Sequence, residues 1–332
     1  MNRKSLKYFL NWLHSTNKQE LEGFTLIELL VALAIGSIAI AGLLSIVTNM
    51  LQADQKDAAR AETQQQTQMA LDYIGEELKE AVYVYDGRCF QAGGQPGLCS
   101  YVAGTAGYVL NPDANSVPIV AFWKLRPFPQ FIQTMCASPN PPAATNCTSG
   151  KSYSLVVYYL RQNLPSDPTQ WQGPARITRY ELTQFDSSNN TVTAGYIDPS
   201  AVGTSFQSWP QVNGTPPTSS VTPNSVNILV DSIDFPTATP NLNCTNPKNL
   251  TPAPTTSSYV ASPLNGSASF YACVRTTANA TATGVNQQGT TQDVWLYLTG
   301  NASGKTGLNN NLYRPTLNTD VIVRGVPNKV PF

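Results

Sequence analysis

The chain has 332 residues, which is enough for a long helix and one or two globular domains. Lys plus Arg and Asp plus Glu number 20 each, and charged residues make up only 12% of the chain, so no basic excess favours nucleic acid as the main partner. Beyond residue 90, Ser, Thr, Asn, Gln, Gly and Pro dominate, which is typical of exported, loop-rich proteins rather than of cytosolic enzymes.

A long apolar run follows a polar N-terminal segment. Residues 1–23 carry four basic and two acidic side chains, whereas Phe24 to Met50 are almost all Leu, Ile, Val, Ala and Gly, with Glu28 the only charge. About 20 apolar residues span a bilayer as a helix. The basic residues ahead of the span keep the N-terminus cytoplasmic by the positive-inside rule. We therefore expect a single-pass protein of the inner (plasma) membrane, with the rest of the chain exported.

The order of the N-terminal signals differs from that of an ordinary secretory signal, whose apolar core is removed by cleavage. Here Gly23 precedes the apolar run. A cut after Gly23 would remove residues 1–23 as a leader, leave the span attached, and make Phe24 the new N-terminus.

The hexapeptide Gly-Phe-Thr-Leu-Ile-Glu at 23–28 resembles the processing motif of type IV prepilins and type II secretion pseudopilins. The resemblance implies cleavage after Gly23 by a prepilin peptidase/methyltransferase, N-methylation of Phe24, and a role in assembly for Glu28, the acid at the fifth mature position. In that family the acid is thought to meet the N-terminal amine of a neighbouring subunit. The implied partners are the major pilin, other minor pilins or pseudopilins, the inner-membrane platform protein and membrane lipid.

Glu28 has a second interpretation, since an acid in the first turn also complements the helix dipole. A carboxylate inside a bilayer is costly and is usually paired. Together with the leader and the span, this cost favours the assembly role.

The apolar run continues into a helix-forming segment. Residues 51–82 contain no Pro and are rich in good helix formers. Leu71, Ile74, Leu78 and Val82 follow helical spacing, which predicts a face docked on a core more often than one that binds a partner. We expect a transmembrane or filament-core helix over 24–51 and an amphipathic helix over 52–85.

The exported remainder, 86–332, predicts a β-rich head with long irregular loops at 186–224 and 236–267. The fold class is therefore α+β: a long N-terminal helix packed on an antiparallel sheet. Short β-rich runs separated by turn residues give the candidate strands, which are 118–125, 152–161, 175–185, 226–235, 269–276, 293–299 and 320–324.

All six cysteines lie on the exported side, where disulfides persist. Fifteen pairings are possible. A metal site is disfavoured because the chain has no Cys-x-x-Cys spacing and its one histidine lies in the leader. No cofactor is expected. The nearest-neighbour pairing would close three local loops, Cys89 with Cys99, Cys136 with Cys147, and Cys244 with Cys273.

Catalytic constellations are not visible in the sequence, and we expect no enzyme. Beyond the leader there is no histidine and no Gly-x-Ser-x-Gly elbow. Solvated positions and turns explain the acid pairs Asp231/Asp234 and Glu181/Asp186 more simply than catalysis. Residues 186–190 offer oxygen ligands for Ca²⁺, but a plain turn is favoured because the acid spacing of a calcium loop is missing.

Tryptophans and short head motifs bear on the role of the head. Trp171 and Trp209 are the better candidates for an exposed sugar- or surface-contacting patch, and Trp295 is expected in the core. Segments 156–161 and 179–182 resemble paired strands of the group that includes W-type minor pilins and J-type pseudopilins. With 70–74, 81–86 and 295–301 added, the chain is similar to the C-type pseudopilins of cyanobacterial hormogonium polysaccharide secretion.

The implied function is that of a minor pilin or pseudopilin, which primes or caps a type IV pilus-like filament in polysaccharide secretion or motility. After leaving the membrane such a subunit lies in a periplasmic or extracellular filament, near its tip. The alternative is a tip adhesin or binding module whose head contacts glycan, a surface or DNA.

Overall fold

The computed structural model describes residues 23–91, 99, 115–138, 147–168, 170–217, 221, 225–235, 242, 244, 259–264, 269–275, 292–305 and 313–323. The basic residues of the leader lie outside these ranges. The chain divides into two compact units between Asp54 and Gln55, and each unit is described by itself.

In the first unit, helix α2 (Leu26–Lys79) begins two residues after Phe24. Its residues are exposed on all sides from 26 to 54, apart from the half-buried Gly36. The large apolar side chains include Leu26 at 82% and Ile38 at 73% exposure. This helix is long and apolar enough to cross a membrane. An apolar surface with no protein against it needs lipid or another protein chain to cover it.

The rest of α2 belongs to the second unit and is amphipathic. Leu71, Ile74 and Leu78 are fully buried, as their spacing predicts. The helix ends at Lys79, however, and residues 81–85 form strand β1 (Ala81–Tyr85), so the prediction of a helix over 52–85 is wrong in its last turn. The β-branched and aromatic sequence Val-Tyr-Val-Tyr favours a strand once it can pair, and β1 pairs with β2.

The larger sheet is antiparallel and has the order β1-β2-β3-β4-β7. Its central strands β3 and β4 are buried on both faces, which explains the continuous apolar run at 155–160 in β3. One face packs on α2, and the other is covered by an aromatic cluster that includes Tyr85, Trp123 and Trp209. The further bounds are β2 (Ser116–Pro127), β3 (Lys151–Gln162), β4 (Ala175–Thr183) and β7 (Ser225–Ile233).

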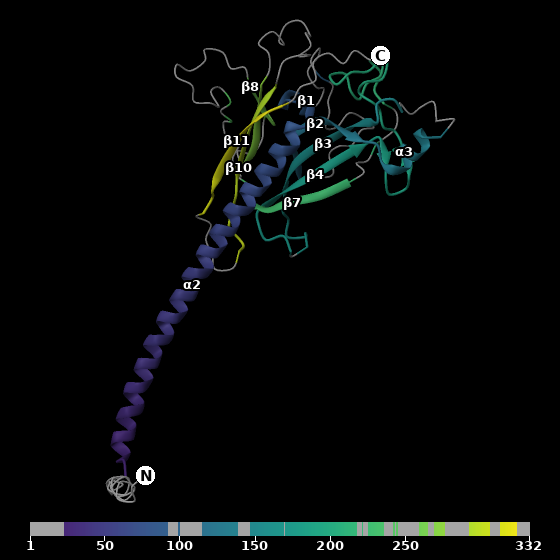
Figure 1. Ribbon diagram of the computed structural model, residues 1–332. Helices are drawn as coiled ribbons and strands as arrows, with labels where there is room; N and C mark the ends of the chain where they lie inside the picture. The colour runs from purple at the N-terminus through teal and green to yellow at the C-terminus, as the bar shows by residue number, and fades with distance from the viewer. Residues whose placement is uncertain are drawn as a thin grey trace, which may run out of the picture. The chain divides into compact units, whose positions relative to one another are not determined.

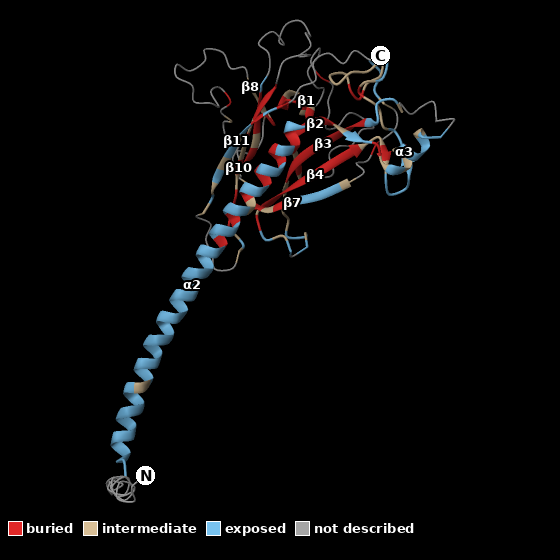
Figure 2. Ribbon diagram, in the orientation of Figure 1, coloured by how far each residue is buried: buried red, intermediate tan, exposed pale blue. Residues whose placement is uncertain are grey.

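A second antiparallel sheet has the order β11-β10-β9-β8. Within the second unit, α2 lies between the two sheets, and one hydrophobic core joins all three (Figures 1 and 2). The α+β class with a long helix on antiparallel sheets is confirmed, with two sheets where one was expected. The strands are β8 (Tyr259–Ser262), β9 (Phe270–Arg275), β10 (Asp293–Thr299) and β11 (Thr316–Ile322).

Several smaller elements were not predicted. Helix α3 (Gln130–Cys136) follows β2, a 3₁₀ turn η1 (Gly87–Phe90) follows β1, and β5 (Phe185–Asp186) forms a hairpin with β6 (Thr191–Val192). Strand β11 begins four residues before the predicted strand at 320. β8 lies inside the stretch predicted to be irregular.

The predicted exposure of two tryptophans is wrong. Trp209 is fully buried, and its Nε1 donates to the carbonyl of Ile197 at 2.9 Å. Trp295 is half-buried rather than in the core, whereas Trp171 is partly exposed and the guanidinium of Arg176 lies 5.1 Å from the ring centroid. The prediction that Trp209 is exposed was based on its polar neighbours in the sequence. Trp209 is buried because the segment after β6 folds back over the sheet.

Three disulfides join the nearest-neighbour pairs, Cys89 with Cys99, Cys136 with Cys147, and Cys244 with Cys273. The sequence separations are 10, 11 and 29 residues, so each bond closes a local loop. Closing loops of this size stabilises a fold by roughly 3 kcal/mol each, chiefly by constraining the unfolded chain.

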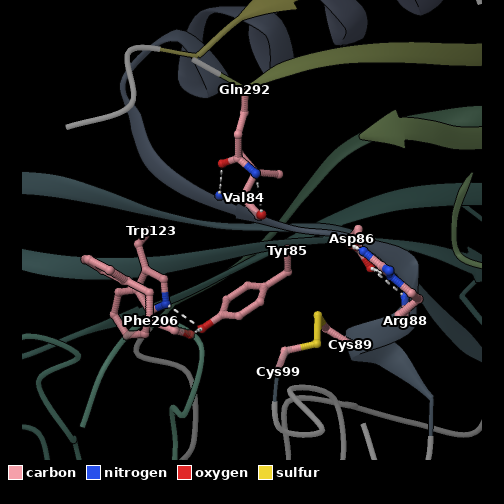
Figure 3. Close-up of a disulfide and its surroundings, with 9 residues drawn as sticks. All are labelled: Val84, Tyr85, Asp86, Arg88, Cys89, Cys99, Trp123, Phe206 and Gln292. Carbon is pink, nitrogen blue, oxygen red and sulfur yellow. Dashed lines mark hydrogen bonds and ion pairs between the residues drawn. A yellow bond between two sulfur atoms is a disulfide. The ribbon is translucent and has the colours of Figure 1, made fainter. Parts of the chain in front are cut away.

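Beside the first disulfide, one side chain takes the place of a neighbouring strand at the sheet edge (Figure 3). The amide of Gln292, just before β10, accepts from Val84 N at 3.0 Å and donates to Val84 O at 3.2 Å. Tyr85 Oη accepts from Trp123 Nε1 at 3.0 Å and donates to the carbonyl of Phe206 at 2.6 Å. Gln292 therefore ties the edge of the larger sheet to the start of a strand in the second sheet.

Replacing Gln292 with Leu should lower the free energy of unfolding by about 1 to 3 kcal/mol, because the N–H and C=O of Val84 would be left buried and unpaired. Gln65→Leu, on the exposed face of α2, is the matched control and should cost far less. Denaturant titration of the full chain in micelles measures both. Equal losses for the two variants would contradict this role of Gln292.

Candidate assembly segment and helix anchor

The segment 23–25 lies outside regular secondary structure and is accessible. Gly23 and Phe24 precede the helix, Phe24 is 80% exposed, and a Cβ built on Gly23 would meet no atom within 4 Å. Thr25 starts the helix: its carbonyl accepts from Glu28 N at 3.0 Å and from Leu29 N at 3.1 Å, and its Oγ1 lies 3.3 Å from Glu28 N. Threonine is a favoured residue at this capping position. The bond between Gly23 and Phe24 thus lies just outside the helix, where a protease can reach it.

Glu28 lies in the first turn of α2, with its side chain exposed. Within the same apolar stretch, Ser37 and Thr48 donate to the carbonyls of Ala34 and Ser45, at 2.8 and 3.0 Å. These bonds satisfy the hydroxyls inside the helix itself, as lipid or a packed fibre requires. A single carboxylate in such apolar surroundings is stabilised by pairing with a cation, which must come from outside this stretch of the helix.

The other end of α2 carries a buried carboxylate, Glu77, that anchors the helix to the larger sheet. Its Oε1 accepts from Lys124 Nζ at 2.7 Å and from Arg179 Nη2 at 2.8 Å. Its Oε2 accepts from Arg179 Nε at 2.8 Å and from the hydroxyl of Tyr158. Glu77, Lys124 and Arg179 are each less than 10% exposed. We call Glu77, Lys124, Tyr158 and Arg179 the helix anchor.

Next to the helix anchor lies a second buried acid, Glu181, which is 3% exposed. Arg179 Nη1 lies 2.9 Å from Glu181 Oε2, while Ser154 Oγ and Arg126 Nη1 approach Oε1 at 2.9 and 3.0 Å. Two buried acids therefore face two buried cations and one half-exposed arginine. Buried charges are stable only when they are paired in this way.

The surroundings shift the pKa values of the helix anchor. Burial alone would raise the pKa of Glu77, but hydrogen bonds from Arg179, Lys124 and Tyr158 outweigh it and lower the pKa to about 2. Burial raises the pKa of the Tyr158 hydroxyl, and the negative charge of Glu77 raises it further, so Tyr158 remains a donor. Glu77 is therefore ionised, and the anchor holds its full set of partners, at neutral pH.

A second set of contacts holds α2 about three turns earlier. Lys305 Nζ lies 3.1 Å from Glu62 Oε1 and 3.2 Å from Gln66 Oε1. Gly300 approaches the helix so closely that a Cβ there would come within 2.5 Å of Thr67 Oγ1. The chain after β10 thus packs on the helix where its side chains are small.

The acids considered for catalysis have structural partners instead. Asp231 accepts from the backbone N–H groups of Gln172 and Gly173, at 2.8 and 3.2 Å. Asp234 Oδ1 accepts from Asn301 Nδ2 at 2.7 Å. Asp186 caps its own turn, and the hydrogen bond from the Ser188 backbone lowers its pKa. Within the described ranges, no group of three or more His, Cys, Asp or Glu side chains could hold a metal ion.

The helix anchor was missed at the sequence level, although it left a signal. Glu77 interrupts the buried stripe of α2 between Ile74 and Leu78, and Arg179 and Glu181 are charged residues in a strand that is buried almost throughout. A charge inside a predicted core pattern calls for a partner of opposite sign. The sequence does not state which strand supplies that partner.

Similarity to a known protein family was found for the N-terminal segment. Residues 22–44 match the family model of the prokaryotic N-terminal methylation motif. Neither the curated proteins nor the solved structures contain a match to the chain. The methylation motif implies processing by a prepilin peptidase, and the apolar helix behind it is consistent with a membrane-anchored pilin.

The helix anchor predicts a pH dependence whose sign follows from the lowered pKa of Glu77. Its contribution to stability is complete above the ordinary carboxyl pKa of 4.5 and is lost as pH falls towards about 2. Over that interval the free energy of unfolding should fall by roughly 3 kcal/mol on account of this group. Denaturant titrations of the full chain at several pH values between 2 and 6 measure the change.

Glu77→Gln should be less stable than the parent at pH 7 by about 3 kcal/mol or more, since it leaves buried cations uncompensated. It should also show a flatter pH profile below pH 4.5. Glu76→Gln, on the exposed face next to Lys79, should retain the parent profile. If the pH profile of Glu77→Gln ran parallel to that of the parent, another acidic residue would be responsible for the loss of stability at low pH.

Proposed function

We propose that this type IV pilin-like subunit is a minor pilin or pseudopilin, a structural protein that primes or caps a pilus-like filament. One observation carries the proposal: a helix whose apolar first part is exposed on all sides begins two residues after an accessible Gly23-Phe24 bond, with Glu28 in its first turn. The match to the methylation motif over the same residues supports it. In this proposal the peptidase cleaves after Gly23 and methylates Phe24.

The mechanism is assembly rather than catalysis. The apolar part of α2 first holds the subunit in the membrane and later packs in the fibre, so the same surface is covered by lipid and then by protein. Glu28 pairs with the amine of Phe24 on a neighbouring subunit, which sets the register between subunits. The major pilin, other minor pilins or pseudopilins, and the platform protein of the assembly machine are the partners that this mechanism requires.

The finer role follows from the size of the head and from the resemblance of its segments to pseudopilins. A head with two sheets and long loops is bulky, and a bulky subunit fits best where no further subunit has to pack above it, at the filament tip. Similarity to the hormogonium pseudopilins supports a role in polysaccharide secretion, with motility as a second output of such filaments. The subunit would pass from the plasma membrane to a periplasmic or extracellular filament.

Gly23→Val should block maturation, because a β-branched side chain at the cleavage position obstructs the peptidase. The variant should retain the 23-residue leader and migrate more slowly than the mature chain on immunoblots. Gly36→Val is the matched control: a Cβ there also meets nothing within 4 Å, and this variant should be processed normally. Equal mobility of the parent chain in cells with and without the peptidase would overturn the proposal.

Glu28→Gln should be cleaved normally but enter filaments poorly. Loss of an ion pair contributing about 1.4 kcal/mol at each junction would lower incorporation roughly tenfold. The measurement is the amount of the subunit in sheared filaments relative to the membrane fraction. Asp57→Asn, an exposed acid on α2 of the second unit, serves as the control. Normal incorporation of Glu28→Gln would remove the assembly role of this carboxylate.

A further inference from the structure

The head has a partly open cleft of about 450 Å³ at one corner of the larger sheet. It is lined by the end of β2, the start of β3, the end of β4 and the start of β7, together with the segment before α3 and the β5–β6 hairpin. Its polar side chains are five hydroxyls, one guanidinium and two carboxylates. They are Ser152, Thr183, Ser187, Ser188, Ser225, Arg126, Glu181 and Asp186.

The guanidinium is held in place from below. Arg126 is half-exposed, and its Nη1 lies 3.0 Å from Oε1 of the buried Glu181. Glu181 is itself held by Arg179 and Ser154, at 2.9 Å each. An arginine has five N–H donors in a fixed planar fork, so Arg126 retains donors for a ligand after pairing with Glu181. Its charge is offset by that same acid.

The hairpin contributes an ionised carboxylate to the lining of the cleft. Asp186 Oδ1 accepts from Ser188 N at 2.8 Å, and Oδ2 accepts from Asn189 Nδ2 at 2.7 Å. These two bonds fix its orientation. The Ser188 hydroxyl and the Asn189 backbone also hydrogen-bond to this carboxylate. Because the side chain is partly exposed, a hydroxyl group of a ligand can take the place of one of these donors.

The remaining wall is apolar and rigid. Pro127, Phe128, Pro129 and Phe185 line the cleft. Phe128 packs edge-on against Phe185, with ring centroids 5.5 Å apart. Phe128, Phe185 and Ile132 form a small hydrophobic cluster, separate from the two main cores. The disulfide between Cys136 and Cys147 closes the loop after α3. A separate cluster and a disulfide therefore support this corner, so the cleft is formed before any ligand arrives.

We propose that this cleft binds a neutral saccharide unit. Its volume lies within the range of about 300 to 1,000 Å³ that is usual for small-molecule sites. A sugar ring has apolar C–H faces and hydroxyl edges that both donate and accept, which matches a lining that combines prolines with carboxylates, a guanidinium and several hydroxyls. The charges of Arg126 and Arg179 balance those of Glu181 and Asp186, so no net charge at the cleft favours an ionic ligand.

The test uses the mature full chain in amphipol, because sugar-based detergents would compete for the cleft. Maltotriose and cellotriose are the neutral probes, and digalacturonic acid is the acidic one. Saturation-transfer NMR should give saturable binding of at least one neutral probe at millimolar affinity or tighter, with weaker binding of the acid. No saturation by either neutral probe, or tighter binding of the acid, would overturn the proposal.

Variants on the hairpin locate the site without disturbing the cores. Asp186→Asn keeps the turn but weakens the acceptor, and should raise the Kd about tenfold, whereas Ser187→Trp should fill the cleft and abolish saturation. Asp320→Asn, an exposed acid on the second sheet, is the control and should bind as the parent does. Thermal midpoints confirm that each variant is folded. Unchanged affinity in both hairpin variants would place the bound sugar elsewhere and sink the assignment.

Discussion

The helix anchor is the interaction on which the head depends. Strands β2, β3 and β4 each contribute one side chain to the carboxylate of Glu77, through Lys124, Tyr158 and Arg179. Apolar packing is non-directional, so Leu71, Ile74 and Leu78 alone would tolerate a small rotation or slide of the helix. The hydrogen bonds to the Glu77 carboxylate, at 2.7 to 2.8 Å, do not tolerate such a movement. The anchor thus fixes the register between helix and sheet, and any force applied along α2 acts on it.

The sequence predicted those parts of the molecule whose signals are local and periodic. The apolar run from Phe24, the stripe of Leu71, Ile74 and Leu78, and the strand 293–299 each follow from residue spacing. The end of α2 did not, because the preference of Val82 to Tyr85 for a strand takes effect only through pairing with β2. The exposure predicted for Trp209 was wrong for a similar reason, since the burial of this side chain depends on which segment folds over the sheet.

The helix anchor and the cleft were beyond sequence reasoning because both depend on long-range register. Tyr158 meets Arg179 only because β3 and β4 pair with these two residues opposite each other. Glu181 is opposite Val156 in the same register, on the face that α2 covers. A shift of one residue would turn these charges to the other face. Buried charges in a strand can be recognised in a sequence, whereas their partners require the fold.

Glu181 contacts the helix anchor and also lines the cleft, so a ligand bound in the cleft acts on a residue next to the anchor. Its Oε2 faces Arg179, and its Oε1 faces Ser154 and Arg126. A ligand that draws Arg126 towards itself would still leave Glu181 with a buried cation and a hydroxyl. Arg179 would keep both bonds to Glu77. Because the buried acid has more partners than it needs, the cleft can exchange ligands while the helix stays fixed to the sheet.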